Sequence, residues 1–415
     1  MLLRLAIASL LARWITAGLT IFAIALSVAL FLGVEKVRNG ARISFADTIS
    51  NTDLIVGARS GSVQLLLYSV FRIGNATNNI TWETYKDLEQ RPEVDWIVPI
   101  SLGDSHRGYR VMGTSQEYFE RYKFRAGRSL DFAEGGPFDD LFDAVIGADV
   151  AAALGYTLDD PIVVAHGLAS FTEHDDKPFR VAGILAKTGT PVDRTVIVSL
   201  AAIEAIHVDW SGGARTGPAI SAEAVREMDL TPKAITAAMI GVTSRLKVFA
   251  LQRSINDYPE EPLLAVLPGV ALQELWEIVG VAETALVGVS AMVVATALLG
   301  MAAMIFAGLN ERRREMAIFR AAGAGPRVIG AMLMIEAVLL TAAAIVFGIV
   351  LLYTGLLVAR PYVDAAYGLY LPITGLDGQE FGVLGAILGA SAVISLVPAL
   401  RAYRMSIADG MTIRT

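Results

Sequence analysis

The four histidines of the chain are its best candidates for holding a metal ion, and they are His106, His166, His174 and His207. The successive spacings of 60, 8 and 33 residues match none of the short ligand motifs typical of zinc sites. There are no cysteines that could supply thiolate ligands instead. We therefore expect isolated, solvated loop histidines and no metal site, with a metal site in the outer domain as the alternative.

The sequence carries no recognisable motif for nucleotide hydrolysis or for other catalysis. A phosphate loop of the form G-x-x-x-x-G-K-[ST] is absent, and the nearest glycine cluster, residues 323–325, lacks the lysine. Neither G-x-S-x-G nor H-E-x-x-H occurs. We expect a non-catalytic chain without a cofactor of its own.

One strongly charged segment, residues 311–320, combines arginines and glutamates with apolar side chains. An apolar edge can seat in a groove while charges set its orientation, so this segment is suited to docking on a partner protein. The alternative is that the arginines serve only to fix the membrane topology and to contact lipid headgroups. The candidate coupling residues are Glu311, Arg312, Arg313, Arg314, Glu315, Ile318, Phe319, Arg320 and Gly323.

The amino-acid composition indicates the kind of protein that holds these residues. Of 415 residues, 54% are hydrophobic and only 18% are charged, and the net charge is -7. Ordinary soluble domains are about 25% charged. The chain therefore belongs in a membrane, and a net acidic chain offers no basic face for nucleic acid.

Four charge-poor segments are long enough to cross a bilayer, which requires about 20 apolar residues. They are residues 15–34, 284–309, 328–359 and 381–400. An apolar stretch at residues 2–11 favours a short helix at the inner interface. The uncharged segment 15–34 is 20 residues long and exceeds the 7 to 15 of a signal-peptide core, so we expect an uncleaved span.

The arrangement of the spans is one plus three. The first domain is residues 1–34, the insert is residues 35–282, and residues 283–415 hold the last three spans with the loop at 310–327. If all four segments cross, one side of the membrane holds the segment before the first span, the loop between the second and third spans, and the segment after the fourth. These segments contain ten arginines and only three acids, so both termini should be cytoplasmic and the insert should face outward.

The insert has 23 basic and 33 acidic residues and alternates short β-rich runs with helical ones, which predicts an α+β domain of two lobes in an α+β membrane protein. A helix at residues 82–90 should be capped by Thr81 or Thr84, and another should end at Gly155. The predicted strands are residues 53–56, 96–99, 109–112, 144–146, 161–164, 179–185 and 195–198, with further helices at 149–154 and 200–206.

Helical patterns continue past the first two spans, at residues 34–50 and 268–283. If continuous, they form a stalk between membrane and outer domain, with Val37, Leu275 and Val279 as stalk residues. The alternative is two amphipathic helices packed on the surface of the outer domain.

Glu336 is the one acid well inside a predicted span. Charges in a membrane usually face the bundle interior or a partner group. We expect a structural helix-to-helix role, with a role in translocation as the alternative.

The run ERRREMAIFRAAGAGPRVIGAMLMIEAVLL, residues 311–340, resembles the cytoplasmic loop of the MacB/FtsX family of ABC-transporter permeases. The closing segment 398–410 resembles that family's P-A-x-R-A-x-R ending. In the insert, residues 109–119, 144–156 and 179–189 are similar to the periplasmic domain of MacB-type subunits. The sequence departs at Asp159-Asp160-Pro161, where the family usually has Gly-Asp before a strand.

The resemblance implies a permease subunit in a bacterial inner membrane, two copies of which assemble with two ATPase chains. It favours docking of the charged loop on the ATPase, and implies that closure of the ATPases moves the stalk and the outer domain to expel or release periplasmic cargo. Further candidate partners are a periplasmic adaptor or substrate-binding protein and membrane lipid. The alternatives are a lipoprotein-releasing subunit, or an FtsX-like regulator or sensor that transports nothing, although an insert of 248 residues is large for FtsX.

Overall fold

The computed structural model describes residues 2–125, 127–167, 174–211, 214–215, 220–311, 318, 320–321, 323–367 and 372–404. It divides into two compact units. The membrane unit comprises residues 1–39, 280–361 and 372–415, and the outer unit comprises residues 40–279 and 362–371.

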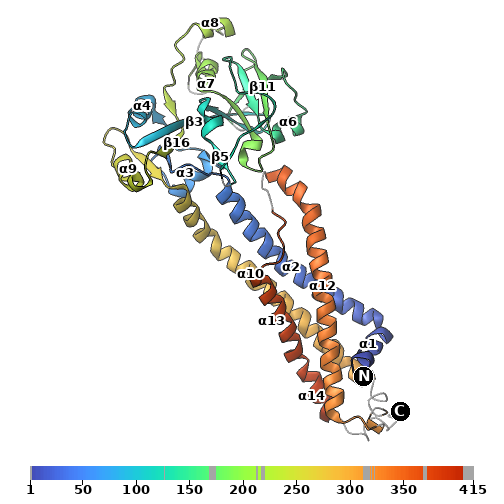
Figure 1. The fold of residues 1–415 in the computed structure, drawn as a ribbon. Helices are drawn as coiled ribbons and strands as arrows, with labels where there is room; N and C mark the ends of the chain where they lie inside the picture. Colours follow the sequence, from blue (N-terminus) through green and yellow to red (C-terminus); the bar gives the residue numbers. More distant parts are fainter. Residues whose placement is uncertain are drawn as a thin grey trace. The chain divides into compact units, whose positions relative to one another are not determined.

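Long apolar helices make up the membrane unit (Figure 1). Four segments are long and apolar enough to cross a membrane: Trp14–Asp47, Pro268–Leu309, Pro326–Val363 and Gly378–Ala402. One precedes the outer domain and three follow it. The helices are α1 (Leu2–Ala12), α2 (Trp14–Asp47), α10 (Pro268–Glu311), α12 (Pro326–Tyr367), α13 (Gly378–Ile394) and α14 (Leu396–Arg404).

The fourth predicted span, residues 381–400, is divided between two helices. α13 ends at Ile394, Ser395 forms a turn, and α14 begins at Leu396. Pro398 lies in the first turn of α14, where its lack of an N–H and its ring are tolerated, whereas both would disrupt a continuous helix. The hydroxyl of Ser395 donates to the carbonyl of Ala392 at 2.7 Å and satisfies one of the last acceptors of α13.

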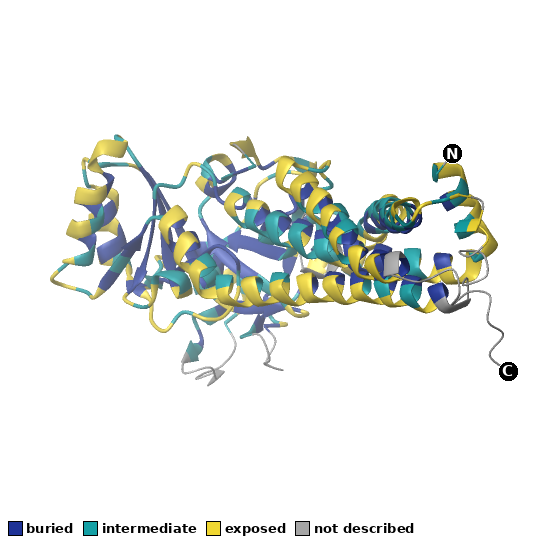
Figure 2. Ribbon diagram, turned by 90° about the horizontal axis from the view of Figure 1, so that it is seen from below, coloured by how far each residue is buried: buried dark blue, intermediate teal, exposed yellow. Residues whose placement is uncertain are grey.

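Apolar side chains lie both where these helices pack together and on their outer faces. Ile24, Val28, Leu298, Met301 and Leu340 are among the buried residues of the bundle core. The outer faces of the helices are largely exposed in Figure 2, and large apolar side chains lie on them. Such a surface is suited to lipid, because an α-helix pairs its interior backbone groups with one another. Exposed examples are Leu19, Phe22, Leu26, Leu286, Met292, Val346 and Val350.

An 11-stranded mixed sheet forms the centre of the outer unit, in the order β17-β1-β16-β3-β4-β12-β8-β11-β7, with β10 paired to β3 and β9 to β11. The β4–β12 and β8–β11 pairs are parallel. The strands are β1 (Leu54–Ala58), β3 (Val94–His106), β4 (Tyr109–Thr114), β7 (Phe132–Gly135), β8 (Asp143–Ile146), β9 (Pro161–Ile162), β10 (Ala165–His166), β11 (Phe179–Leu185), β12 (Thr195–Ser199), β16 (Ala237–Val242) and β17 (Leu263–Val266).

Short helices and two-residue strands surround this sheet. The α-helices are α3 (Ser62–Ser69), α4 (Trp82–Glu89), α5 (Glu117–Arg121), α6 (Ala148–Leu154), α7 (Leu200–His207), α8 (Ala222–Arg226) and α9 (Val248–Asn256), and 3₁₀ turns cover Pro191–Arg194 and Arg245–Lys247. The short pairs are β2 (Ile80–Thr81) with β15 (Ala234–Ile235), β5 (Lys123–Phe124) with β6 (Arg128–Ser129), and β13 (Trp210–Ser211) with β14 (Ala214–Arg215).

The sheet brings the two ends of the outer domain together. β1 follows α2 along the chain and pairs with β17, which leads directly into α10, so that Ile55 lies opposite Val266. The first and last strands of the outer domain, which follow α2 and precede α10 along the chain, are therefore adjacent in one sheet. The 11 strands form one continuous sheet, although separate apolar cores lie around β8, β11 and β12 and around β1, β16 and β17.

Several local predictions agree with the fold. The hydroxyl of Thr81 accepts from the backbone N–H of Thr84 at 3.3 Å, and α6 ends at Gly155, which has φ +71°. The predicted strand at 161–164 is wrong in its extent, because β9 ends at Ile162 and β10 begins at Ala165. Asp159, at the departure from the family sequence, adopts φ +68°, a left-handed conformation for which glycine is the usual residue.

Candidate functional site

The predicted coupling segment is only partly described. Arg312, Arg313, Arg314, Glu315 and Phe319 lie outside the described residues. For Glu311, the last residue of α10, the structure describes only the backbone.

The remaining coupling residues mark where the chain turns between α10 and α12. The side chain of Ile318 is 66% exposed, which leaves an apolar group available to a partner. The N–H of Gly323 donates to the carbonyl of Arg320 at 3.1 Å, with φ +91° at Gly323. α12 then begins at Pro326, a favoured first helical residue because its missing N–H would be unpaired there anyway.

Glu336 is buried and paired with Arg13. Its side chain is 1% exposed, and its Oε2 lies 3.5 Å from Nη2 of Arg13, the residue between α1 and α2. A buried carboxylate needs such a partner because desolvation penalises an isolated charge. This ion pair joins the N-terminal elbow to α12 and supports the structural role that we predicted for Glu336.

A second buried ion pair joins α2 to α13. Nζ of Lys36 lies 2.9 Å from Oε2 of Glu380 and also donates to the carbonyl of Gly375 at 2.7 Å. Glu380 caps its own helix as well, because its carboxylate accepts the N–H of Asp377 at 2.8 Å. The sequence analysis did not pair these two charges; the signal it missed is that acids beside apolar segments require cationic partners on other helices.

Where α2 and α10 reach the outer unit, aromatic side chains pack them together. The centre of the Phe45 ring lies 5.6 Å from the centre of the Trp276 ring and 4.5 Å from the centre of the Phe71 ring. The guanidinium of Arg42 lies 5.5 Å from the centre of the Trp276 ring, within range of a cation–π interaction.

The predicted stalk residues lie on these same two helices. Leu275 is partly buried against the domain core, to which Leu272 of α10 also belongs. Val37 of α2 is 47% exposed and Val279 of α10 is 36% exposed. The two helices continue unbroken past both residues, as the stalk hypothesis requires.

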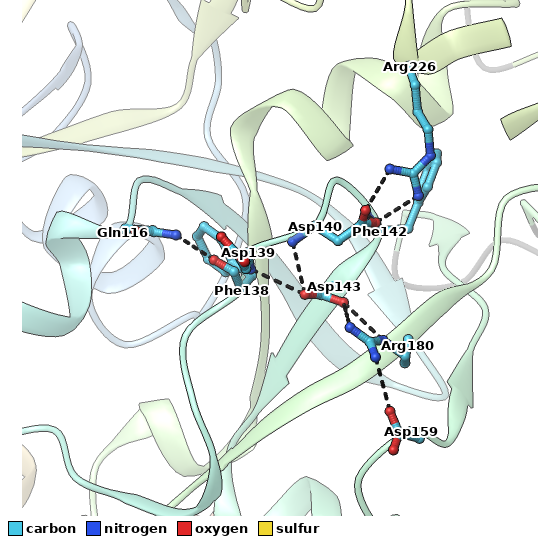
Figure 3. Close-up of polar contacts among 9 residues, drawn as sticks. All are labelled: Gln116, Phe138, Asp139, Asp140, Phe142, Asp143, Asp159, Arg180 and Arg226. Atoms are coloured by element: carbon cyan, nitrogen blue, oxygen red, sulfur yellow. Dashed lines mark hydrogen bonds and ion pairs between the residues drawn. The ribbon is translucent and has the colours of Figure 1, made fainter. Parts of the chain in front are cut away.

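A polar network fastens the loop before β8 (Figure 3). The buried carboxylate of Asp143 accepts from the backbone N–H of Asp140 at 3.0 Å and from Nη2 of Arg180 at 2.8 Å. Arg226 makes a bidentate ion pair with Asp140 at 2.6 and 2.7 Å. This contact holds the pKa of Asp140 below its usual value and raises that of Arg226. The donors and acceptors satisfy one another, so we interpret this network as structural.

Three of the four histidines meet, which contradicts our expectation that they are isolated. His166, His174 and His207 come together with Asp104, and one ligand-type atom from each lies within 4.8 Å of the others. His106 is engaged elsewhere: Nδ1 lies 2.6 Å from the carbonyl of Val163, and Nε2 lies 2.9 Å from the hydroxyl of Tyr156. Sequence spacing missed this cluster because the fold brings its members together. Strand pairing places His166 opposite Asp104, whereas His174 precedes β11 and His207 ends α7.

Comparisons with known proteins agree with these features. A family model for the MacB-like periplasmic core domain matches residues 17–252, and one for the FtsX-like permease C-terminal matches residues 287–407. No curated protein matches the chain.

Two solved structures are similar to part of the chain. One is the periplasmic region of MacB from Actinobacillus actinomycetemcomitans, at 10% identity and a TM-score of 0.35, over 55% of this chain and 94% of that one. The other is the extracellular domain of the noncanonic ABC-type transporter YknZ from Gram-positive bacteria, at 14% identity and a TM-score of 0.31, over 52% of this chain and 100% of that one.

The first family model alone covers more than half of the chain, and the second begins within α10 and includes the last two apolar segments. Together they account for a membrane protein with an extracytoplasmic domain after its first helix, and the family implies a partner ATPase. The chain therefore belongs to the MacB/FtsX family of ABC-transporter permeases, as a transmembrane subunit of an ABC transporter.

Proposed function

We propose that this subunit converts ATP hydrolysis on a partner ATPase into movement of its outer domain, which expels or releases an extracytoplasmic cargo. Two copies would assemble with two ATPase chains, which would bind the ATP and Mg²⁺. A periplasmic adaptor or substrate-binding protein would be a further partner.

The observation that carries this proposal is the continuity of α2 and α10. Each runs as one helix from an apolar segment into residues that pack on the outer-domain core, through Phe45 on α2 and Leu272 on α10. A continuous helix transmits displacement along its axis, because bending it sharply requires a proline, a π-bulge or a broken hydrogen bond. The β1–β17 pair anchors both helices to one sheet, so that movement of the helices reaches the sheet directly.

The orientation follows from the arginines. We propose that the four apolar segments cross a bacterial inner membrane with both termini in the cytoplasm and the outer domain on the periplasmic side, because arginine-rich flanks remain cytoplasmic. The segment between α10 and α12 then faces the cytoplasm. We propose that it docks on the ATPase through Ile318 and its charged neighbours.

An interface substitution tests the docking step. We expect Ile318→Asp to reduce co-purification of the ATPase from detergent, because a charge in an apolar groove must be desolvated without a partner. Leu246→Asp is the matched control, since Leu246 is also an exposed apolar residue, at 94%, but lies in the outer unit. Full recovery of the ATPase with Ile318→Asp would reject this segment as the contact.

A further inference from the structure

The cluster around Asp104 is separate from the coupling path. We propose that Asp104, His166, His174 and His207 form a binding site for a divalent transition-metal ion, and that Zn²⁺ fits it best. The site lies within the outer unit, so a failure of this proposal would leave the proposed function unaffected.

The distances between the ligand-type atoms suit tetrahedral coordination. Nδ1 of His166 lies 3.1 Å from Nε2 of His207, and Oδ1 of Asp104 lies 3.4 Å from the first and 3.5 Å from the second. Ligand atoms that surround one ion tetrahedrally with bonds of about 2.0–2.1 Å are themselves roughly 3.3–3.4 Å apart. These three atoms are therefore already spaced as ligands around one ion.

His174 supplies the fourth ligand. Its side chain is 0% exposed, and neither ring nitrogen has a hydrogen-bond partner among the residues that the structure describes. An imidazole buried in this way is costly unless something binds it, and a metal ion would do so. The centre of the His174 ring lies 4.6 Å from the centre of the Trp210 ring and 5.1 Å from the centre of the His207 ring, so that His174 packs between these two rings.

A backbone contact orients one ligand, and strand pairing places two others. Nδ1 of His207 lies 2.8 Å from the carbonyl of Ile203, so that Nδ1–H can donate to it and leave the Nε2 lone pair for a metal ion. His166 and Asp104 are directly opposed in the antiparallel β10–β3 pair, which places their side chains side by side on one face. Register and helix geometry thus preset the site.

The donor set indicates the type of ion. Three imidazoles and one carboxylate suit Zn²⁺ and its neighbours in the first transition series, whereas Ca²⁺ and Mg²⁺ prefer oxygen ligands alone. Four protein ligands close the coordination sphere, as in structural rather than catalytic zinc sites. The His166 side chain is 42% exposed, which gives an ion access from solvent.

Such an ion would tie together segments that are distant in sequence. Its ligands come from β3, from β10, from the turn before β11 and from the end of α7. Binding to the folded state alone raises the stability of that state, so occupancy of the site should stabilise the outer unit.

Metal titration of the full-length protein in detergent tests the proposal. After treatment with a chelator, we expect the protein to bind about one Zn²⁺ per chain by calorimetry and to melt at a higher temperature with Zn²⁺. X-ray absorption should show nitrogen and oxygen ligands at about 2.0–2.1 Å. We expect His166→Gln and Asp104→Asn to weaken binding by at least roughly 100-fold, since removing even outer-sphere partners costs 10–100-fold.

His106→Gln provides the matched control, because it also removes a histidine from the outer unit but leaves all four proposed ligands in place. It should bind Zn²⁺ as the parent does. The partly exposed His166 makes His166→Gln tolerable to the fold, and a melting curve without metal checks this directly. Absence of stoichiometric binding in the parent, or binding that survives both ligand substitutions, would overturn the proposal.

Discussion

The ammonium group of Lys36 lies 2.9 Å from a carboxylate oxygen of Glu380, and both side chains are buried, at 8% and 2% exposure. The contact joins two helices that lie far apart in the sequence, one before the outer domain and one after it. Its energetics follow from burial, because a buried charge that loses its partner remains desolvated without compensation.

We expect Lys36→Met to lower the free energy of unfolding by about 3–5 kcal/mol, the usual cost of leaving one member of a buried ion pair unpaired. The double variant Lys36→Met with Glu380→Gln should recover much of that loss, since glutamine is neutral and still suits the capping box. Denaturant unfolding in detergent measures both values. A double variant less stable than Lys36→Met would contradict this explanation.

Gly241 in β16 leaves no room for a side chain. A Cβ atom there would lie 2.0 Å from Nε1 of Trp96, against which the strand packs. We expect Gly241→Ala to destabilise the outer unit by about 1–3 kcal/mol, as overpacking usually does. Gly103→Ala in β3 is the control, because a Cβ atom at Gly103 would meet no other atom within 4 Å, and this variant should melt near the parent temperature.

The absence of cysteine allows the topology to be tested with single cysteines. Leu246→Cys, at a 94% exposed position of the outer unit, should react with a membrane-impermeant maleimide in spheroplasts. Ile318→Cys, at a 66% exposed position, should react only after the membrane is permeabilised. The opposite pattern would show that the proposed orientation is inverted.

Local chemistry made part of this fold predictable. The Thr81 cap, the Gly155 stop and the strand Phe179–Leu185 each depend on a few neighbouring residues, and each agrees with its prediction. The four apolar segments were equally evident, because hydrophobic length is read directly from sequence.

Long-range pairing was not predictable in the same way. β16 and β17 were missed, although β16 lies between β1 and β3. β16 contains two alanines and a glycine, which carry a weak β signal, and β17 is only four residues long. The pairing of Asp104 with His166 depends on strand register, which no spacing rule contains. The Lys36–Glu380 ion pair likewise depends on which helices pack together.

ATP-driven movement, in the function that we propose, reaches the outer domain through α2 and α10. A proline at Val279 would break α10, because it removes a backbone hydrogen bond and clashes with the carbonyl of Leu275, whereas Val279→Ala preserves the helix. The matching pair on α2 is Val37→Pro and Val37→Ala. All variants should insert and assemble with the ATPase, since neither residue lies in the proposed docking segment.

The most direct measurement is hydrogen–deuterium exchange of the outer domain, with and without ATP, in the assembled transporter reconstituted in nanodiscs. We predict an ATP-dependent change in exchange around β1 and β17 in the parent and in both alanine variants. The change should be lost in the variant that combines Val37→Pro with Val279→Pro, while ATP hydrolysis persists. An undiminished ATP-dependent change in that variant, with both helix breaks verified, would contradict transmission through these helices.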